Sequence, residues 1–295
     1  MELRWFRYFL MVVREENISR AAELLHITQP TLSRQMSQLE EAAGTQLFVR
    51  GKHLQLTEAG LMLRHRAEEV VQLMDKIQSE LQDQENMEGT INIGIGGQKA
   101  VAFIMECLDD FQQLYPKVKY DVYTNNADNI KEYLERGLLD FGVLLEPVDI
   151  SRYDYFRLDD KDRWGLLMPA DSPLAAKDCV TMKDMLTVPI ITTKRQFLHK
   201  EIRNWVGDEF DKLKIKATYD IITNVASLVA CGKAYAFTLD GAVALCDPAR
   251  LTFRPLQPEL SMSSVLAWKK FKPGYNLVWK FLEYFQQRHE ARHSL

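Results

Sequence analysis

The segment Thr28-QPTLSRQMSQLEEAA-Gly44 decides the fold of the amino-terminal part of this chain. Thr28 can accept a hydrogen bond from the free amides of a first helical turn. Pro30 is tolerated in that turn because its missing amide would have had no partner there. Gly44 can adopt the left-handed backbone conformation that ends a helix. The sequence therefore predicts a helix between Thr28 and Gly44.

The two faces of this helix differ in polarity. At about 100° per residue, Leu32, Met36 and Leu39 share one side, which is expected to be buried. The opposite side, with its flanks and tip, carries small and hydrogen-bonding residues: Gln29, Pro30, Thr31, Ser33, Arg34, Ser37 and Gln38. Arginine can bridge the two acceptors of guanine and glutamine can bridge adenine, while Ser and Thr reach phosphates or base edges. A polar outer face is also the default for any surface helix, so a merely solvated helix stays open here.

A shorter helix is expected just before this one. Asn17 or Ser19 can cap a helix from residue 20 to about residue 25, and residues 26–27 then make a tight turn. A helix, a short turn and a second helix form the arrangement that sets the second helix in the major groove of DNA.

A basic hairpin is expected after the second helix. Residues 47–56 read as two short strands around a glycine-containing turn, with Arg50, Lys52 and His53 at its tip. Such a hairpin beside a reading helix is a wing that can grip the phosphate backbone. We therefore expect Arg50 and Lys52 to contact DNA.

A long helix follows, capped by Thr57. Over residues 58–85 apolar positions recur in alternating steps of four and three, as in a heptad seam: Leu63, Ala67, Val70, Met74, Ile77 and Leu81. A helix of this length with a continuous apolar stripe usually needs a partner helix, which predicts dimerisation, although packing on its own domain is the alternative.

From residue 89 onward short strands alternate with helices, which is typical of an α/β domain. Strands are expected at 90–95, 118–123, 141–145, 164–168, 188–191, 215–222, 234–238 and 265–268, with helices at 100–115, 127–136 and 275–291. The expected division is a DNA-binding domain at 1–58, a linker helix at 59–88 and an effector domain at 89–295. Its first lobe would hold residues 89–163 and 265–295 and its second lobe residues 164–264, with the chain crossing between them twice.

The composition excludes several classes of protein. In 295 residues, 46% are hydrophobic and 26% charged, which is ordinary for a globular chain. The longest apolar runs fall short of the roughly 20 residues that span a bilayer, so no membrane segment is expected. The first apolar run is followed by Arg14, Glu15 and Glu16 rather than by a signal-peptide cleavage site, which predicts a cytoplasmic protein. Residues 1–66 carry nine basic and seven acidic side chains although the whole chain has a formal net charge of −4, an asymmetry whose sign suits a nucleic-acid-binding amino terminus.

No catalytic or metal-binding constellation is found. The four cysteines lie far apart with no C-x-x-C pair, and no G-x-S-x-G occurs. The run from Gly94 to Lys99 lacks the third glycine of a dinucleotide-binding loop. His289 and His293 stand four apart on an expected helix, where a solvated role is favoured over metal binding. We therefore expect no enzyme, no metal and no cofactor.

Together these motifs resemble the DNA-binding region of LysR-type transcriptional regulators. The residues that carry the resemblance are Ser19-Arg20-Ala21-Ala22-x-x-Leu25, Gln29-Pro30-Thr31-Leu32-Ser33-Arg34-Gln35-Met36-x-x-Leu39-Glu40, Gly44, Leu47-Phe48-x-Arg50 and Leu56-Thr57-x-Ala59-Gly60. The resemblance implies an α+β multidomain protein: an N-terminal winged helix-turn-helix, a long linker helix and a C-terminal two-lobed α/β effector domain similar to periplasmic solute-binding proteins. It also implies homodimers through antiparallel linker helices, association into homotetramers, and binding to inverted repeats in double-stranded promoter DNA. His53 departs from the arginine-rich turn that is usual in the wing.

The resemblance also implies where a small-molecule effector binds. The implied positions are Gly96, Gly97, Gln98, Lys99, Thr192, Thr193, Thr223, Asn224 and Thr238. Lys99, Lys194 and Arg195 make an anion such as a small carboxylate the first expectation, although each could equally be a solvated loop cation. Gln98 and Asp240 depart from the family pattern, and Asp240 would repel an anion if it faced inward. A neutral or aromatic hydrogen-bonding ligand therefore stays open.

The sequence thus predicts a DNA-binding transcriptional regulator controlled by a small molecule in the cleft of its carboxyl-terminal domain. One alternative keeps the DNA-binding module but has no ligand, which gives a constitutive regulator. An alternative from another class is a solute-binding protein, which would need an export signal and would have no use for a helix-turn-helix.

Overall fold

The computed structural model describes residues 1–49, 54–82, 87–194, 203–205, 207–244, 246–270 and 277–293. They belong to two compact units, Met1–Gln82 and Asp83–Leu295.

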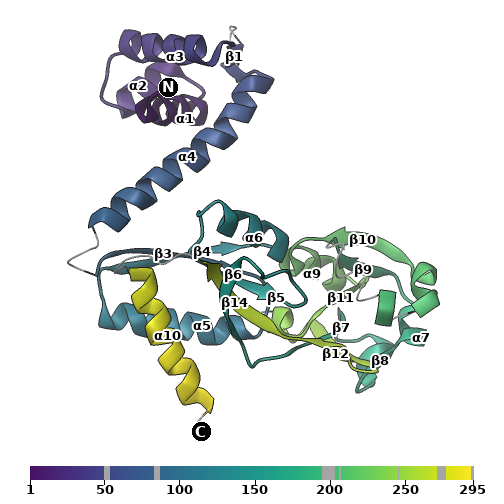
Figure 1. The fold of residues 1–295 in the computed structure, drawn as a ribbon. Helices are drawn as coiled ribbons and strands as arrows, with labels where there is room; N and C mark the ends of the chain where they lie inside the picture. Colours follow the sequence, from purple (N-terminus) through teal and green to yellow (C-terminus); the bar gives the residue numbers. More distant parts are fainter. Residues whose placement is uncertain are drawn as a thin grey trace. The chain divides into compact units, whose positions relative to one another are not determined.

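The first unit is a helical domain with a small hairpin (Figure 1). Its elements are α1 (Leu3–Glu15), α2 (Ile18–Leu24), α3 (Gln29–Ala43), β1 (Phe48–Val49), β2 (Gln55–Leu56) and α4 (Glu58–Gln82). The side chain of Asn17 caps α2 by accepting from the Arg20 amide, so α2 starts two residues earlier than expected. The Thr28 side chain caps α3, and Gly44 ends it with a φ of 67°, as predicted.

The two strands expected after α3 pair in antiparallel fashion, with Phe48 opposite Leu56. The Thr57 hydroxyl accepts from the Gly60 amide at 3.0 Å and donates to the Gln46 carbonyl at 2.7 Å. Thr57 therefore joins the hairpin to the first turn of α4. The tip of the hairpin, with Arg50, Lys52 and His53, lies outside the described residues.

The apolar stripe of α4 divides into two parts. Leu63 and Ala67 pack into the core of the helical domain, so the first part of the predicted seam serves its own domain. Val70, Met74 and Ile77 are 44%, 38% and 41% exposed. Among the described side chains of the stripe, this later part is the one that is exposed and could pack against a partner helix.

The second unit contains two sheets. In the first, the strand order is β4 (Val118–Thr124), β3 (Gly89–Ile95), β5 (Phe141–Leu145), β14 (Ser264–Lys269) and β6 (Tyr153–Arg157). The strands β4, β3 and β5 are parallel, and β14 runs antiparallel to β5 and β6. The strand β6 was not predicted.

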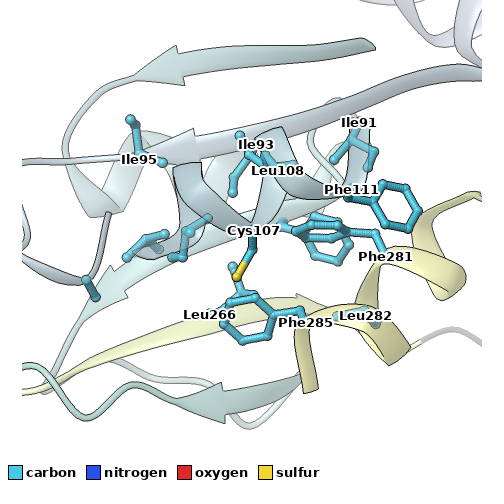
Figure 2. Close-up of a cluster of buried hydrophobic side chains, with 14 of the residues drawn as sticks. Ile91, Ile93, Ile95, Cys107, Leu108, Phe111, Leu266, Phe281, Leu282 and Phe285 are labelled. Atoms are coloured by element: carbon cyan, nitrogen blue, oxygen red, sulfur yellow. The ribbon is translucent and has the colours of Figure 1, made fainter. Parts of the chain in front are cut away.

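Helices cover both faces of this first sheet. On one face, α5 (Ala100–Leu114) and α10 (Leu277–His293) pack against β3, β5 and β14 in a cluster that includes Phe111, Phe281 and Phe285 (Figure 2). On the other face, α6 (Ala127–Glu135) packs through Ile130 and Leu134. The last helix therefore returns to the first sheet, as expected.

The second sheet has the order β10 (Ile215–Tyr219), β9 (Ile190–Thr193), β11 (Tyr235–Leu239), β7 (Asp162–Pro169), β12 (Leu251–Gln257) and β8 (Val180–Thr181), with β13 (Ser261–Met262) also paired to β7. The strands β10, β9 and β11 are parallel, whereas β7 runs antiparallel to β11 and β12. Shorter helical elements lie around it: η1 (Pro173–Ala176), α7 (Met182–Met185), η2 (Gly207–Lys212), α9 (Ile222–Ala230) and η3 (Gly241–Val243). The strand expected at 215–222 ends at Tyr219, because Ile222 begins α9.

The chain passes between the two sheets after β6 and again before β14, so it crosses twice, as predicted. Among the described residues, no helix has the length and hydropathy needed to span a membrane.

Candidate DNA interface and effector site

The outer face of α3 is open to solvent. Leu32, Met36 and Leu39 are at most 3% exposed and form part of the domain core. The side chains on the opposite side are exposed, except that of Ser33, which is half-buried: Gln29, Pro30, Thr31, Ser33, Arg34, Ser37 and Gln38. Arg34 forms no hydrogen bond or ion pair with any residue that the structure describes. Its guanidinium is therefore not held by any described residue and is open to a hydrogen-bond acceptor from outside the protein.

Hydrogen bonds at the edges of this face orient its polar groups. The hydroxyl oxygens of Thr28 and Thr31 lie 2.8 Å apart, and the Gln35 amide donates to Gln38 Oε1 at 3.1 Å. The first turn of α3 holds no acidic residue. The free amides at the start of this helix can therefore face a phosphate without competition from a carboxylate in that turn.

Glu40 attaches the hairpin to α3. Its Oε1 atom accepts hydrogen bonds from the backbone amides of Leu47 at 2.8 Å and Phe48 at 3.2 Å. Sequence reasoning assigned no role to this residue, because a glutamate late in an amphipathic helix gives no local sign of a bond to a later strand. Glu40 is a positioning residue for the strand that leads to Arg50 and Lys52, which themselves lie outside the described part of the chain.

The predicted effector residues gather at the carboxyl ends of parallel strands. Ile95 at the end of β3 is in register with Thr124 of β4, and residues 96–99 follow directly. In the second sheet, Ile191 of β9 is in register with Ala236 of β11. That pairing brings the ends of both strands to one edge, where the buried side chains are Thr192, Thr193 and Thr238. The carboxyl edge of a parallel sheet is where α/β proteins bind ligands.

Thr223 and Asn224 lie in the first turn of α9 and are exposed. They follow β10, whose end is paired with that of β9, since Tyr219 is in register with Thr193. The structure therefore places both residues after the same sheet edge as Thr192 and Thr193.

The loop after β3 packs directly on the segment after β11. A Cβ atom added to Gly97 would lie 2.7 Å from the Cβ atom of Ala242. A Cβ atom added to Gly241 would collide with the Lys99 amide nitrogen and with Asp162 Oδ1. Glycine is needed at 97 and 241 so that these two segments can touch. Gly97 is among the positions expected to bind an effector, but what approaches it here is the protein itself.

Gln98 does not extend freely from this loop. Its side chain is folded back, so that Oε1 accepts from the Gly96 amide at 3.1 Å, and the residue is 8% exposed.

The cations predicted to attract an anion have acidic partners. Lys99 Nζ lies 2.7 Å from Asp240 Oδ2, and Arg163 Nε lies 3.0 Å from the same oxygen. Burial alone would raise the pKa of Asp240, but the hydrogen bonds from Lys99 and Arg163 outweigh burial and hold that pKa below its usual value. Lys194 pairs with Asp220 at 3.2 Å. Lys99 and Lys194 are therefore already neutralised by carboxylates and do not favour an anionic effector, and Arg195 lies outside the described residues.

A buried carboxyl group, which sequence analysis missed, lies beside Lys99. Asp162 is 0% exposed, and its Oδ1 atom accepts from the Lys99 amide at 3.0 Å. Burial raises the pKa of Asp162 to about 6, although the Lys99 amide opposes this effect. Its Oδ2 atom has no hydrogen-bond partner among the described residues. No local signal could have revealed this contact, because the two residues are far apart in the sequence.

Over the described ranges, no group of three or more His, Cys, Asp or Glu side chains could hold a metal ion. His289 Nε2 instead lies 3.2 Å from Asp159 Oδ2.

Known proteins share both parts of this architecture. Residues 3–61 match the family model of bacterial regulatory helix-turn-helix proteins of the lysR family, and residues 84–290 match the LysR substrate binding domain. The transcriptional regulator YtlI of Bacillus subtilis (strain 168) is 31% identical over 228 residues, which cover 74% of this chain and 72% of YtlI. The Hca operon transcriptional activator HcaR of Escherichia coli (strain K12) is 27% identical over 275 residues, 92% of each chain.

The fold also matches a solved structure. Full-length CbnR in complex with its target DNA aligns with a TM-score of 0.74 at 18% identity, over 99% of both chains. With matches to both family models over nearly the whole chain, this protein belongs to the LysR family of transcriptional regulators and combines a DNA-binding helix-turn-helix with an effector-binding domain.

Proposed function

We propose that the outer face of α3 reads promoter DNA in the major groove. The observation that carries this proposal is the exposure of residues 29–31, 34, 37 and 38 together with the absence of a described partner for Arg34. Arg34 would bridge the two acceptors of a guanine, and Gln38 would donate to N7 of an adenine and accept from its N6 amino group. Thr31, Ser33 and the start of the helix would bind phosphates or base edges. The chain would act in the cytoplasm, where bacterial promoter DNA lies.

In this proposal, Arg50 and Lys52 hold the flanking phosphates. The proposal is supported by Glu40, which attaches the preceding strand to α3. A phosphate contact adds affinity for any DNA sequence and makes binding sensitive to salt, whereas a base contact adds discrimination.

The chain would form homodimers through α4. Val70, Met74 and Ile77 present an exposed apolar stripe, and burying such a stripe against a second helix removes apolar surface from water. Each dimer would read an inverted repeat with two copies of α3, and dimers would associate into tetramers.

The effector would bind at the carboxyl edges of the two sheets. The residues proposed to line this site are Gly96, Gly97, Gln98, Lys99, Thr192, Thr193, Thr223, Asn224 and Thr238. A bound molecule can change the pose of paired DNA-binding units only if it binds two assemblies with unequal affinity.

Selection of DNA fragments from a random pool by the full-length chain tests the DNA-reading proposal. We expect enrichment of an inverted repeat, with binding that the Arg34→Ala variant loses selectively. Failure to enrich any sequence at low ionic strength would contradict the proposal. Thermal unfolding with candidate small molecules separates a sensing regulator from a constitutive one, because a ligand that binds the folded chain raises its unfolding temperature.

A further inference from the structure

The amino terminus of α5 already holds a carboxylate. The first amides of a 15-residue helix such as α5 are natural donors to an anion. In this protein the Lys99 amide, at the N-cap of α5, donates to Asp162 Oδ1 at 3.0 Å. The Gly241 amide also favours the charged form of the same carboxyl group. Asp162 thus lies where the carboxylate of a ligand would otherwise be received.

The position beside the Lys99 amide that a ligand carboxylate would take is already filled by the carboxyl group of Asp162. Asp162 is fully buried, and the protein approaches Gly241 so closely that a Cβ atom there would collide with Asp162 Oδ1. The neighbouring cations already have an anionic partner, because Asp240 forms ion pairs with both Lys99 and Arg163. The four side chains Lys99, Arg163, Asp162 and Asp240 are formally balanced when both carboxyl groups are ionised.

One of the two carboxylate oxygens of Asp162 is an unused hydrogen-bond acceptor. Asp162 Oδ2 is buried and accepts no hydrogen bond from the residues that the structure describes. A buried acceptor without a donor is costly, so a ligand that supplies a donor to it gains affinity. A ligand group that donates a hydrogen bond to Asp162 Oδ2 would therefore fit this site.

We propose that Asp162 is the resident anion of the effector site, and that the effector presents a hydrogen-bond donor, such as a hydroxyl or amine group, to Asp162 instead of a carboxylate to α5. This inference rests on the proposed effector site and assigns a ligand class to it. It reverses the preference for an anion that the lysines alone suggested.

Thermal unfolding of the full-length chain in sodium formate or sodium benzoate, against sodium chloride at equal ionic strength, tests this assignment. We expect neither carboxylate to stabilise the wild-type protein beyond chloride. In the Asp162→Ser variant, the shortened side chain vacates the position and leaves the Lys99 amide without its carboxylate. Formate should then produce a saturable rise of roughly 2–4 °C in the unfolding midpoint. The Asp162→Asn variant is the matched control, because its side chain fills the same space and should not respond.

Saturable stabilisation of the wild-type protein by formate or benzoate would overturn the proposal. A folded Asp162→Ser variant with no formate-specific rise would overturn it as well. If that variant does not fold, the wild-type comparison alone decides between the two ligand classes.

DNA binding by the same preparations separates this inference from the proposed function. A wild-type chain that selects a DNA sequence and also binds formate would refute the ligand class and leave DNA reading intact. A chain that selects no DNA would count against the proposed function, whatever its response to carboxylates.

Discussion

Glu40 Oε1 lies 2.8 Å from the backbone nitrogen of Leu47, and this hydrogen bond joins the reading helix to the strand that follows it. A second bond, from the Phe48 amide at 3.2 Å, holds the same strand. One carboxylate thus receives both amides and adds to the core packing of Leu47 and Phe48, which also holds this strand. If α3 reads DNA and the hairpin binds phosphates, as proposed, Glu40 connects the two parts.

Replacing Glu40 with alanine should destabilise the DNA-binding unit. The change leaves two backbone amides without their acceptor, which costs about 1–3 kcal/mol of unfolding free energy. Glu41→Ala, at the exposed neighbouring position, is the control and should stay within about 0.5 kcal/mol of wild type. Denaturant unfolding gives the free energy of unfolding of both variants. Equal losses for Glu40→Ala and Glu41→Ala would show that the hydrogen bonds from Leu47 and Phe48 do not stabilise the unit.

Arg34→Ala should reduce sequence discrimination. If Arg34 bridges a guanine, its loss lowers specific affinity by about 1–3 kcal/mol and leaves binding to random DNA much less affected. Titration of operator and random duplexes at one salt concentration measures this difference. An unchanged ratio of the two affinities would rule out base reading by Arg34.

Lys52→Ala should weaken binding to all DNA sequences by a similar factor. Loss of one phosphate contact reduces the slope of log K against log salt by roughly 1. A salt titration of the variant gives this slope directly, and a slope equal to that of wild type would remove Lys52 from the phosphate contacts.

Met74→Asp should break the dimer through α4. It places a charge in the exposed stripe formed with Val70 and Ile77, where a partner helix would have to bury it without a counter-charge. Gln72→Asp, at an exposed position opposite the stripe, is the matched control. Light scattering after size-exclusion chromatography should show smaller particles for Met74→Asp alone. Identical masses for both variants would place the dimer contact elsewhere.

Asp162 should make stability fall as the pH rises from about 4 to about 6. Its pKa in the folded chain is about 6, above the usual value of 3.8, because burial penalises the charge more than the Lys99 amide stabilises it, and neighbouring Asp240 adds to the increase. Over this range the folded chain keeps a proton that the unfolded chain has lost, so each step upward in pH favours unfolding.

Asp162→Asn removes this dependence. Relative to wild type, the variant should gain up to about 3 kcal/mol of unfolding free energy between pH 4 and pH 7. Asp121→Asn, at an exposed position, is the control. If the unfolding free energies of wild type and Asp162→Asn changed with pH in parallel, ionising Asp162 would not destabilise the folded protein, contrary to this prediction.

The elements that the sequence predicted best have local signals at both ends. The boundaries of α3 follow from Thr28, Pro30 and Gly44, each of which acts within its own turn. Thr57 gives the start of α4 in the same way. The start of α2 was less certain because Asn17 and Ser19 are both good caps, and the structure selects Asn17.

What the sequence could not show depends on distant contacts. The strand β12 was missed because Pro255 interrupts its pattern, although that residue is in register with Gly165 of β7. The ion pair between Lys99 and Asp240 and the bond between Lys99 and Asp162 join residues from separate elements. Since no local pattern encodes these pairs, the loop cations looked free to bind an anion.

Methylation interference on a selected operator tests the major-groove account most directly, because methyl groups on guanine N7 lie in the major groove and those on adenine N3 in the minor groove. We predict that guanine N7 methylation blocks binding at two symmetric half-sites, and that Arg34→Ala becomes insensitive to one such guanine in each half-site. Interference confined to adenine N3, with guanine N7 methylation tolerated throughout, would contradict insertion of α3 into the major groove.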